Sequence, residues 1–412
     1  MQMSGATAKT VLCVASLALA GCSQMPEKSA INLSPWDRQN VETLIAVVNE
    51  ASAHGLDPAN YDVEDLEAAR LGRPDAVTET AASEIFAQLA GDLVEGTVGP
   101  ERRDIWFIEG TAADPDIIRR IMDKALREHR VAEALAALAP PHPQYKALKA
   151  ALARTPGDDI EAINRLRLNL ERWRWMPRQL GPDYILVNVA AFELIVVRDN
   201  FEVDRRRVIA GAAKTPTRQF AATVTGVSFN PTWYVPPSIV AESVGALLES
   251  DPAAALQKGY YVGPDGGVRQ SPGPNNALGQ MKLVMPNNYS VFLHDTPAKA
   301  LFKREARALS HGCIRVEDAL GFAQVLLQPA LDAEAIAEIV SSLSTVTVEL
   351  ERPLPLYVTY FTAVANGDGS VSFHSDIYDR DRLLAAEVDD RQRDGAIAAP
   401  APGEGCPVEA SN

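Results

Sequence analysis

A histidine and a cysteine in the second half of the chain are spaced like a catalytic base and its nucleophile. His294 precedes Cys313 by 19 positions (313 − 294), and Cys313 comes directly after Gly312. A cysteine thiol needs a nearby base, because its ordinary pKa of ~8.5 leaves it mostly protonated at neutral pH. Histidine is the side chain most often used as that base. The pair therefore predicts acyl transfer, in which Cys313 attacks an amide carbonyl, expels an amine, and His294 moves the proton.

Each residue also has a purely structural interpretation. A lone cysteine is usually a small buried apolar residue, and His294 could simply end a strand after Val291-Phe292-Leu293. The chain contains only 4 cysteines, however, and Cys313 lies in a polar turn with a glycine rather than in an apolar run. The two residues together therefore favour catalysis over packing.

The residues before Cys313 complete a longer motif. Ser310-His311-Gly312-Cys313 follows His294 after 15 residues, 295 to 309. This pattern resembles that of the L,D-transpeptidases, which crosslink bacterial peptidoglycan. The resemblance implies an α+β fold, with an N-terminal helical scaffold domain and a mainly β catalytic domain that carries an inserted lid. It also implies a cysteine acyl-enzyme that forms 3→3 crosslinks between peptidoglycan stem peptides, with no metal or other cofactor.

Further segments resemble the larger members of this family, those of the YcbB type, over residues 165 to 380. These segments are Asn169 to Trp175, Asn188 to Leu194, Gly211 to Pro216, Phe229 to Ile239 and Gly273 to Gly279. This chain departs from that type in one respect. Many such proteins have a small peptidoglycan-binding domain between the scaffold and the catalytic domain. Here Ala153 runs almost directly into a helical pattern at Ile160, which leaves no room for such a domain.

The resemblance also implies roles for residues beside the pair. The backbone carbonyl of Asp295 would hold the His294 imidazole in one tautomer. The backbone N–H groups of His311, Gly312 and Cys313 would stabilise the oxyanion. The His311 side chain is either a second titrating group or a packing residue, and the serine at the matching place in related enzymes favours packing. Gly312 suits a tight turn, since glycine tolerates a positive φ.

Arg315, two residues after the cysteine, is the leading candidate for a substrate contact. A guanidinium group suits a carboxylate, and the meso-diaminopimelate of a stem peptide has a free one. An ion pair of Arg315 with Glu317 or Asp318 is the structural alternative. The other candidates for substrate contact are Ser310, Trp233 and Tyr234. The two aromatic residues suit a core position equally well.

Apolar spacing predicts the elements that must position these residues. From residue 36 to about 155, apolar residues recur at helical intervals, as in Val41 to Val48. An amphipathic helix is expected at 160–176, after which β-branched residues and short turns indicate strands. The expected strands are 184–189, 192–198, 202–211, 291–294, 346–350, 357–361 and 370–373. The strand 291–294 would deliver His294 to the site.

The predicted domain organisation has five parts. They are a lipoprotein signal peptide (1–21), a tether (22–35), the helical scaffold domain (36–155), the catalytic domain (160–385) and a disordered tail (386–412). By resemblance, the lid over the site lies at about 236–286 and contains a helix at 243–258. The lid would select the acyl acceptor.

The N-terminus has the pattern of a targeting segment. Lys9 precedes an apolar stretch, 11–20, which is too short to span a membrane. Leu19-Ala20-Gly21-Cys22 resembles the lipobox of bacterial lipoproteins, which implies a lipid on Cys22 and anchorage in the cell envelope on the periplasmic side. Ser23 after the lipid cysteine favours the outer membrane over the inner one. An ordinary secretory peptide cleaved nearby is the alternative.

Composition limits the other function classes. A chain of 412 residues with 47% hydrophobic and 23% charged residues is typical of a globular protein of two or three domains. Its formal net charge of −15 argues against nucleic-acid binding, because it offers no basic surface to phosphates. The scattered His54, His129 and His142 lack the spacing of metal ligands. Cys406 is not expected to pair with Cys313, since a disulfide would silence the nucleophile.

Several functions remain open at this point. Water as acceptor would make the protein an L,D-carboxypeptidase, and a lysine of an outer-membrane protein would make it an anchoring enzyme. A papain-like protease fits less well, because those enzymes place the cysteine before the histidine in the chain. The non-enzymatic alternative is a cell-wall-binding scaffold, against which the intact Cys313 and His294 argue. The sequence leaves the oligomeric state open.

Overall fold

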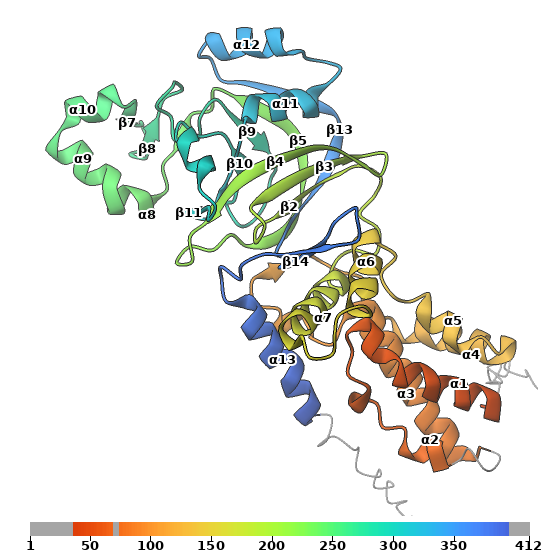
Figure 1. Cartoon of the computed structure of the whole chain (residues 1–412). Helices are drawn as coiled ribbons and strands as arrows, with labels where there is room; N and C mark the ends of the chain where they lie inside the picture. The colour runs from red at the N-terminus through yellow and green to blue at the C-terminus, as the bar shows by residue number, and fades with distance from the viewer. Residues whose placement is uncertain (1–35, 69–73, 395–412) are drawn as a thin grey trace, which may run out of the picture.

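The structure is a computed structural model that describes residues 36–68 and 74–394 (Figure 1). The predicted signal peptide, the tether with Cys22, and Cys406 lie outside the described residues. Within the described ranges, no helix is both long enough and apolar enough to cross a membrane.

Short helices make up the N-terminal part of the described chain, at the lower right of Figure 1. They are α1 Arg38–Asn49, α2 Glu64–Ala68, α3 Ala76–Glu95, α4 Pro115–Glu128, α5 Val131–Ala136 and α6 Pro143–Leu152. Aspartate side chains cap several of them: Asp37 Oδ1 accepts from Asn40 N at 2.8 Å, and Asp75 Oδ1 accepts from Thr78 N at 2.9 Å. The apolar positions of α1 are buried, as their spacing predicts.

The next helix, α7 (Ile160–Arg174), belongs to both halves of the molecule. Its apolar face is buried in the same core as the β-sheet, through Leu166, Leu170 and Trp173. Trp173 stacks on Phe361 with ring centroids 4.5 Å apart. The helix ends at Arg174, two residues before the predicted end.

The C-terminal half is built on a mixed sheet with the strand order β1-β5-β13-β2-β3-β4-β12-β10-β9. The strands are β1 Trp106–Phe107, β2 Tyr184–Asn188, β3 Glu193–Arg198, β4 Phe201–Gly211, β5 Gln219–Phe229, β9 Met281–Val284, β10 Leu293–His294, β12 Ile314–Val316 and β13 Val346–Thr359. A further strand, β11 (Ala308–Ser310), pairs with β4. Because β9 also pairs with β5, the sheet closes on itself around a fully buried apolar core. The predicted order, helices first and a mainly β domain second, is confirmed.

Two predicted features of the C-terminal region are wrong. The expected strands 346–350 and 357–361 are parts of one strand, β13, whose pairing with β5 is irregular between Glu349 and Leu354. The charged and proline-containing stretch there hides the continuity of the strand in the sequence. The expected disorder from residue 386 is contradicted up to Asp394 by helix α13 (Arg380–Asp394). That helix packs on α7, with Leu384 buried in the shared core.

Smaller elements complete this half. The hairpin β14 (Ala363–Ala365) and β15 (Val371–Phe373) confirms the turn predicted before residue 370. Helices α11 (Ala319–Leu327) and α12 (Ala333–Ser341) pack together, and α11 contacts β4, β9 and β13.

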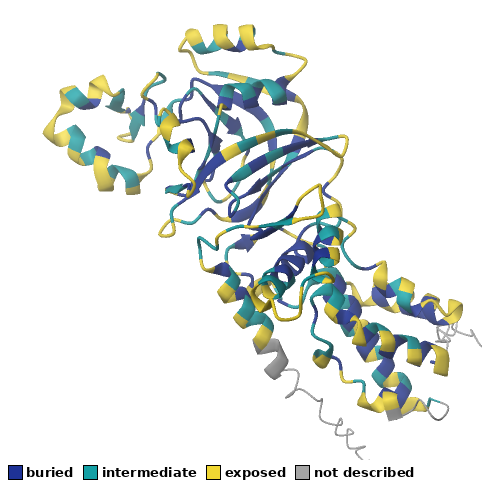
Figure 2. Ribbon diagram, in the orientation of Figure 1, coloured by how far each residue is buried: buried dark blue, intermediate teal, exposed yellow. Residues whose placement is uncertain are grey.

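The segment between β5 and β9 projects from the sheet, at the left of Figure 1, and much of its surface is exposed (Figure 2). We call residues 233–280 the lid. It contains β6 Trp233–Tyr234, α8 Pro237–Ile239, the π-helical turn η5 Val240–Val244, α9 Gly245–Ser250, α10 Pro252–Gln257, β7 Tyr260–Val262 and β8 Val268–Gln270. The predicted helix 243–258 is broken where Asp251 caps α10 by accepting from Ala254 N at 2.9 Å. The predicted lid end at 286 is also wrong, because β9 belongs to the main sheet.

Candidate active site

The turn Ser310–Cys313 joins β11 to β12 and is held by its own first residue. Ser310 Oγ donates to the carbonyl oxygen of Cys313 at 2.5 Å and accepts from Gly312 N at 3.1 Å. Gly312 has a φ of 110°, a conformation that favours glycine. Ser310 is 3% exposed and its hydroxyl shapes the turn, and the substrate contact expected of it stays a prediction. The Gly312 N–H, expected as an oxyanion donor, is already bound to Ser310.

His294 ends β10 and is buried beside the turn. Its Nδ1 lies 2.5 Å from the carbonyl oxygen of Asp295. Because a carbonyl can only accept, Nδ1 carries the proton and the lone pair is on Nε2. Burial, together with the positive charge of Arg315, lowers the pKa of His294 to about 4, although the Asp295 carbonyl opposes the shift. The imidazole is therefore neutral at physiological pH and can accept a proton.

The Asp295 backbone, which orients His294, is itself held in place by its side chain. The carboxylate accepts from Gln280 N at 2.9 Å and forms an ion pair with Lys299. A Cβ at Gly279 would lie 2.3 Å from that carboxylate, so only glycine fits at this position. These contacts fix the carbonyl that faces the imidazole.

Two cations flank His294 across three neighbouring strands. Arg315 of β12 and Lys282 of β9 are both in register with His294, and opposite residues on neighbouring strands point to the same face of a sheet. Cys313 precedes Arg315 by two residues, which places it on that face as well. Lys282 Nζ lies 5.0 Å from the centre of the Phe292 ring. The sequence did not predict Lys282, because its place beside His294 is set by the register of β9 and β10.

The thiol of Cys313 is partly buried among these groups. Its Sγ lies 3.7 Å from the carbonyl oxygen of Ser290, to which it donates. Burial raises the pKa of the Cys313 thiol, whereas the Phe292 N–H and the charges of Arg315 and Lys282 oppose the shift. The resting pair is therefore a neutral thiol and a neutral imidazole, with two positive charges close to the sulfur.

The structural alternative for Arg315 is wrong. Glu317 pairs with Arg207 at 2.5 Å, and Asp318 pairs with Arg206 at 2.5 Å. In the part of the chain that the structure describes, the buried Nε of Arg315 has no hydrogen-bond partner. Arg315 is thus available to an anionic group at the site.

The lid touches the nucleophile turn through His311. His311 is exposed, and its Nε2 lies 3.1 Å from Glu242 Oε2 of η5. Trp233 and Tyr234, predicted as candidate substrate contacts, lie on β6 opposite Gln270 and Arg269. Tyr234 is 65% exposed, so it is not a core residue.

The loop 211–217 contacts the turn, although the sequence predicted no role for the residues of its family-like segment, Gly211 to Pro216. Thr217 Oγ1 donates to the carbonyl oxygen of Gly312 at 2.9 Å, and Thr215 Oγ1 donates to that of Ser310 at 3.0 Å. These two hydroxyl groups tie the loop to the backbone of the turn. Among the described residues, no group of histidine, cysteine, aspartate or glutamate side chains could hold a metal ion.

Two family models match this chain. Residues 182–346 match the L,D-transpeptidase catalytic domain, and residues 35–152 match the Scaffold domain. Among curated proteins, one from Haemophilus influenzae named "Putative L,D-transpeptidase" is 29% identical over 244 residues, which are 53% of this chain and 48% of the relative. The chain therefore spans about half the length of the curated relative it matches.

Solved structures of L,D-transpeptidases are also similar in part. L,D-transpeptidase 3 from Mycobacterium tuberculosis, in complex with a faropenem-derived adduct, is 16% identical, with 43% of this chain and 60% of that chain covered and a TM-score of 0.24. The catalytic domain of the E. faecium enzyme acylated by ertapenem is 14% identical, with 44% and 98% covered and a TM-score of 0.24. Scores this low do not bear on function. The two family matches confirm the predicted resemblance: this chain carries an L,D-transpeptidase catalytic domain, and a scaffold domain precedes it.

Proposed function

We propose that this protein is a peptidoglycan L,D-transpeptidase that forms 3→3 crosslinks through an acyl-enzyme on Cys313. The observation that supports this most directly is the buried His294, whose Nδ1 is 2.5 Å from the Asp295 carbonyl oxygen. That contact leaves the Nε2 lone pair to act as the base. His294 lies on β10, which pairs with β12, the strand that begins directly after Cys313.

In the first step, His294 takes the proton of the Cys313 thiol, and the sulfur attacks the diaminopimelate carbonyl carbon of a donor tetrapeptide. The C–N bond to the terminal residue breaks, and His294 returns the proton to the leaving amine. A thioester on Cys313 remains. The N–H groups of His311 and Cys313 are the candidate oxyanion donors, since Ser310 Oγ occupies the N–H of Gly312.

In the second step, the side-chain amine of another diaminopimelate residue attacks the thioester. The C–S bond breaks as the new amide bond forms, and the amine proton passes through His294 to the sulfur. The free thiol of Cys313 is restored, so no oxidant or external energy source is required.

Arg315 and Lys282 are proposed to bind the free carboxylate of diaminopimelate. The support is their position on either side of His294 and the unpaired Arg315 Nε. Charge-assisted hydrogen bonds to a carboxylate are the strong ones, and an arginine fork makes them in pairs. The donor peptide would thus be oriented by the same row of residues that holds the base.

A lipid anchor on Cys22 is a further proposal, supported by the lipobox-like Leu19-Ala20-Gly21-Cys22. The lipid would hold the protein in the cell envelope, on the periplasmic side and in the outer membrane rather than the inner one. Cys22→Ser should give soluble or uncleaved protein. Normal membrane fractionation with an unchanged mature mass would contradict the anchor.

The acceptor distinguishes this proposal from its alternatives. Water would make the protein an L,D-carboxypeptidase, and a lysine of an outer-membrane protein would make it an anchoring enzyme. Incubation with disaccharide-tetrapeptide separates them, because crosslinked dimer, shortened peptide and unchanged peptide differ in mass. Unchanged peptide with no acyl-enzyme would favour the non-enzymatic scaffold.

The decisive experiment is mass spectrometry of the intact protein after incubation with a carbapenem. Wild type should gain the mass of one adduct, which peptide mapping should place on Cys313. Cys313→Ala should abolish the adduct while keeping the fold, and Cys406→Ser, the matched control, should keep the adduct. An adduct on Cys406, or one that persists in Cys313→Ala, would contradict the proposal.

A further inference from the structure

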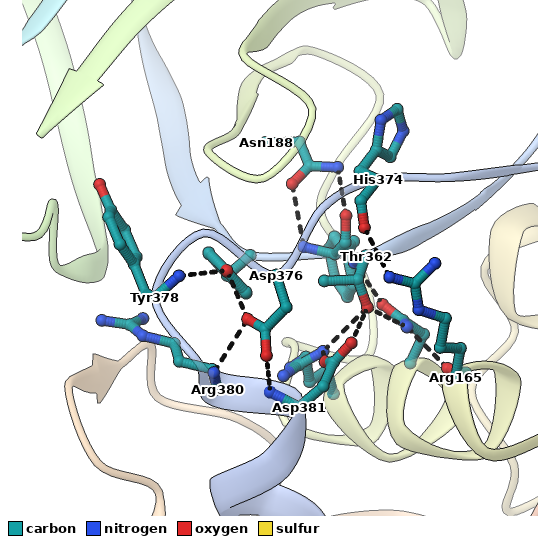
Figure 3. A network of polar contacts seen from close by, with 12 residues as sticks. Arg165, Asn188, Thr362, His374, Asp376, Tyr378, Arg380 and Asp381 are labelled. Atoms are coloured by element: carbon teal, nitrogen blue, oxygen red, sulfur yellow. Dashed lines mark hydrogen bonds and ion pairs between the residues drawn. The ribbon is translucent and has the colours of Figure 1, made fainter. Parts of the chain in front are cut away.

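A segment beyond the end of the catalytic-domain match contacts the loop that holds the nucleophile turn. That match stops at residue 346, whereas residues 362–381 build a network of hydrogen bonds on the side of the sheet that faces α7 (Figure 3). One member of this network, Tyr378, also reaches the loop 211–217. The same loop contacts the turn that carries Cys313.

Tyr378 holds both ends of the loop with one hydroxyl group. Its Oη donates to the carbonyl oxygen of Gly211 at 2.6 Å and accepts from the N–H of Thr217 at 3.2 Å. Burial raises the pKa of Tyr378, so the hydroxyl keeps its proton and remains a donor at neutral pH. Without this hydroxyl, a backbone donor and a backbone acceptor of the loop would lose their partner.

The opposite side of the loop holds the turn. Thr217 Oγ1 accepts from Gly211 N at 2.9 Å and donates to the carbonyl oxygen of Gly312 at 2.9 Å. Ala212 N donates to the carbonyl oxygen of Ser310 at 2.8 Å. A Cβ on Gly211 would lie 3.1 Å from the Gly312 Cα, so loop and turn are in direct contact. Movement of the loop therefore moves the residue before Cys313.

The other end of Tyr378 is fixed within the network of Figure 3. Its N–H donates to Tyr360 Oη at 3.1 Å, and Tyr360 Oη donates to Asp376 Oδ1 at 2.6 Å. The guanidinium of Arg380 lies 5.1 Å from the centroids of both tyrosine rings. Asp376 Oδ2 accepts from Asp381 N at 2.7 Å. The position of the phenol is thus set by this segment and not by the loop it binds.

We propose that Tyr378 is a positioning residue for the acyl transfer. It acts through loop 211–217 to fix the backbone of the Ser310–Cys313 turn, and with it the direction of the thiol. The inference rests on the proposed acyl transfer at Cys313. A displacement of about 1 Å at a reacting atom can cost ~10²-fold in rate, so a residue that never touches substrate can govern the reaction.

The test removes only the hydroxyl group, in the full chain. Tyr378→Phe should lower the rate constant of carbapenem acylation roughly 10- to 100-fold, while the carbapenem concentration that gives half the maximal rate stays unchanged. Amide hydrogen exchange should become faster in residues 308–316. The matched control is Tyr357→Phe, which removes a hydroxyl from β13 and should change neither quantity.

A double-mutant cycle separates positioning from a general loss of stability. If Tyr378 acts through Thr217, Tyr378→Phe combined with Thr217→Val should be little slower than the slower single variant. Additive effects on the logarithm of the rate, or unchanged exchange in residues 308–316, would overturn the inference. A wild type that forms no adduct would instead contradict the proposed function, and the exchange data would still decide the role of Tyr378.

Discussion

At the residue scale, the site keeps its proton on sulfur until substrate is bound. Burial raises the pKa of the Cys313 thiol and, with Arg315, lowers the pKa of His294 to about 4. Neither group is charged at rest, so burial carries no cost of an isolated ion. In the proposed acyl transfer, Lys282 and Arg315 would stabilise the negative charge that develops on sulfur, since both charges oppose the rise in the Cys313 pKa. The arrangement differs from a preformed thiolate–imidazolium pair, in which both groups would already be ionised.

The depressed pKa of His294 predicts the pH dependence of acylation. The base is active only when neutral, so the rate should fall as the pH drops through about 4, and not near the ordinary histidine pKa of 6.5. His294→Ala should slow acylation by ~10²–10⁴-fold and by more than His311→Ala. Adduct formation measured over acidic and neutral pH tests both statements. Equal rates in wild type and His294→Ala would remove this residue from the mechanism.

The proposed carboxylate contact predicts a substrate-dependent loss. Arg315→Ala should lower kcat/KM for tetrapeptide by about 2–5 kcal/mol in transition-state stabilisation. Arg315→Lys should recover part of it, because lysine keeps the charge but not the fork, and Lys282→Gln should show a smaller loss. The comparison substrate is the same peptide with its diaminopimelate carboxylate amidated, for which the variants should differ little from wild type. Equal losses on both substrates would make Arg315 a structural residue.

The candidate catalytic residues could be predicted from the sequence, whereas residues that the fold brings to them from distant segments could not. Cys313, His294 and the Asp295 carbonyl could be proposed from spacing and resemblance. Lys282 and Thr217 could not, because each reaches the site through strand register or a loop contact that joins distant segments. Such long-range pairing is set by the closed sheet and leaves no local signal.

At the scale of elements, a side-chain contact between Glu242 of η5 and His311 links the lid to the nucleophile turn. The contact is exposed and joins single side chains, so it contributes little to stability. The contact places η5 beside His311, two residues before Cys313. His311 thus connects turn and lid, which neither of its two predicted roles included.

This contact predicts an effect on the acceptor step. Glu242→Ala should leave carbapenem acylation within about 5-fold of wild type, because an exposed pair contributes only ~1 kcal/mol or less. The ratio of crosslinked dimer to hydrolysed peptide should fall, since a loosened lid admits water. The matched control is Glu249→Ala in α9 of the same lid. An unchanged product ratio in Glu242→Ala would show that the contact does not govern acceptor access.

Elements were predictable where their pattern is local and uninterrupted. The apolar spacing of Val41 to Val48 lies within α1 as expected, and the strand predicted at 370–373 is β15, Val371–Phe373. The continuity of β13 was hidden by a charged stretch, and α13 by a charged composition whose few apolar residues nevertheless pack on α7. Both elements, β13 and α13, are determined by contacts with distant parts of the chain and not by their local sequence pattern.

At the scale of the whole molecule, half-buried histidines of the scaffold contact α7. His142 of the scaffold stacks on Trp173 of α7, with ring centroids 4.2 Å apart. Burial lowers the pKa of His142 to about 4, and burial with the charges of Lys149 and Arg174 lowers that of His54 to about 3. These histidines remain neutral in the folded protein under conditions in which the unfolded chain would protonate them.

Stability should therefore depend on pH between the unfolded and folded histidine pKa values. Below about 6.5 the unfolded chain takes up protons that the folded protein does not, so the free energy of unfolding should fall as the pH is lowered toward about 4. His142→Gln should flatten the dependence of Tm on pH between these limits relative to wild type. Identical slopes in the two proteins would show that His142 does not contribute to this dependence.

The stacking of Trp173 between His142 and Phe361 limits where the catalytic part can be separated from the rest of the chain. Similarity to known catalytic domains begins at residue 182, but the ring that covers Phe361 comes from α7, and α13 closes over the same helix. A fragment cut at residue 182 would leave an aromatic face of the core open to water. A fragment that keeps this core closed begins before α6 and ends after Leu384. That fragment is the one to fuse when the catalytic part is attached to a different anchor.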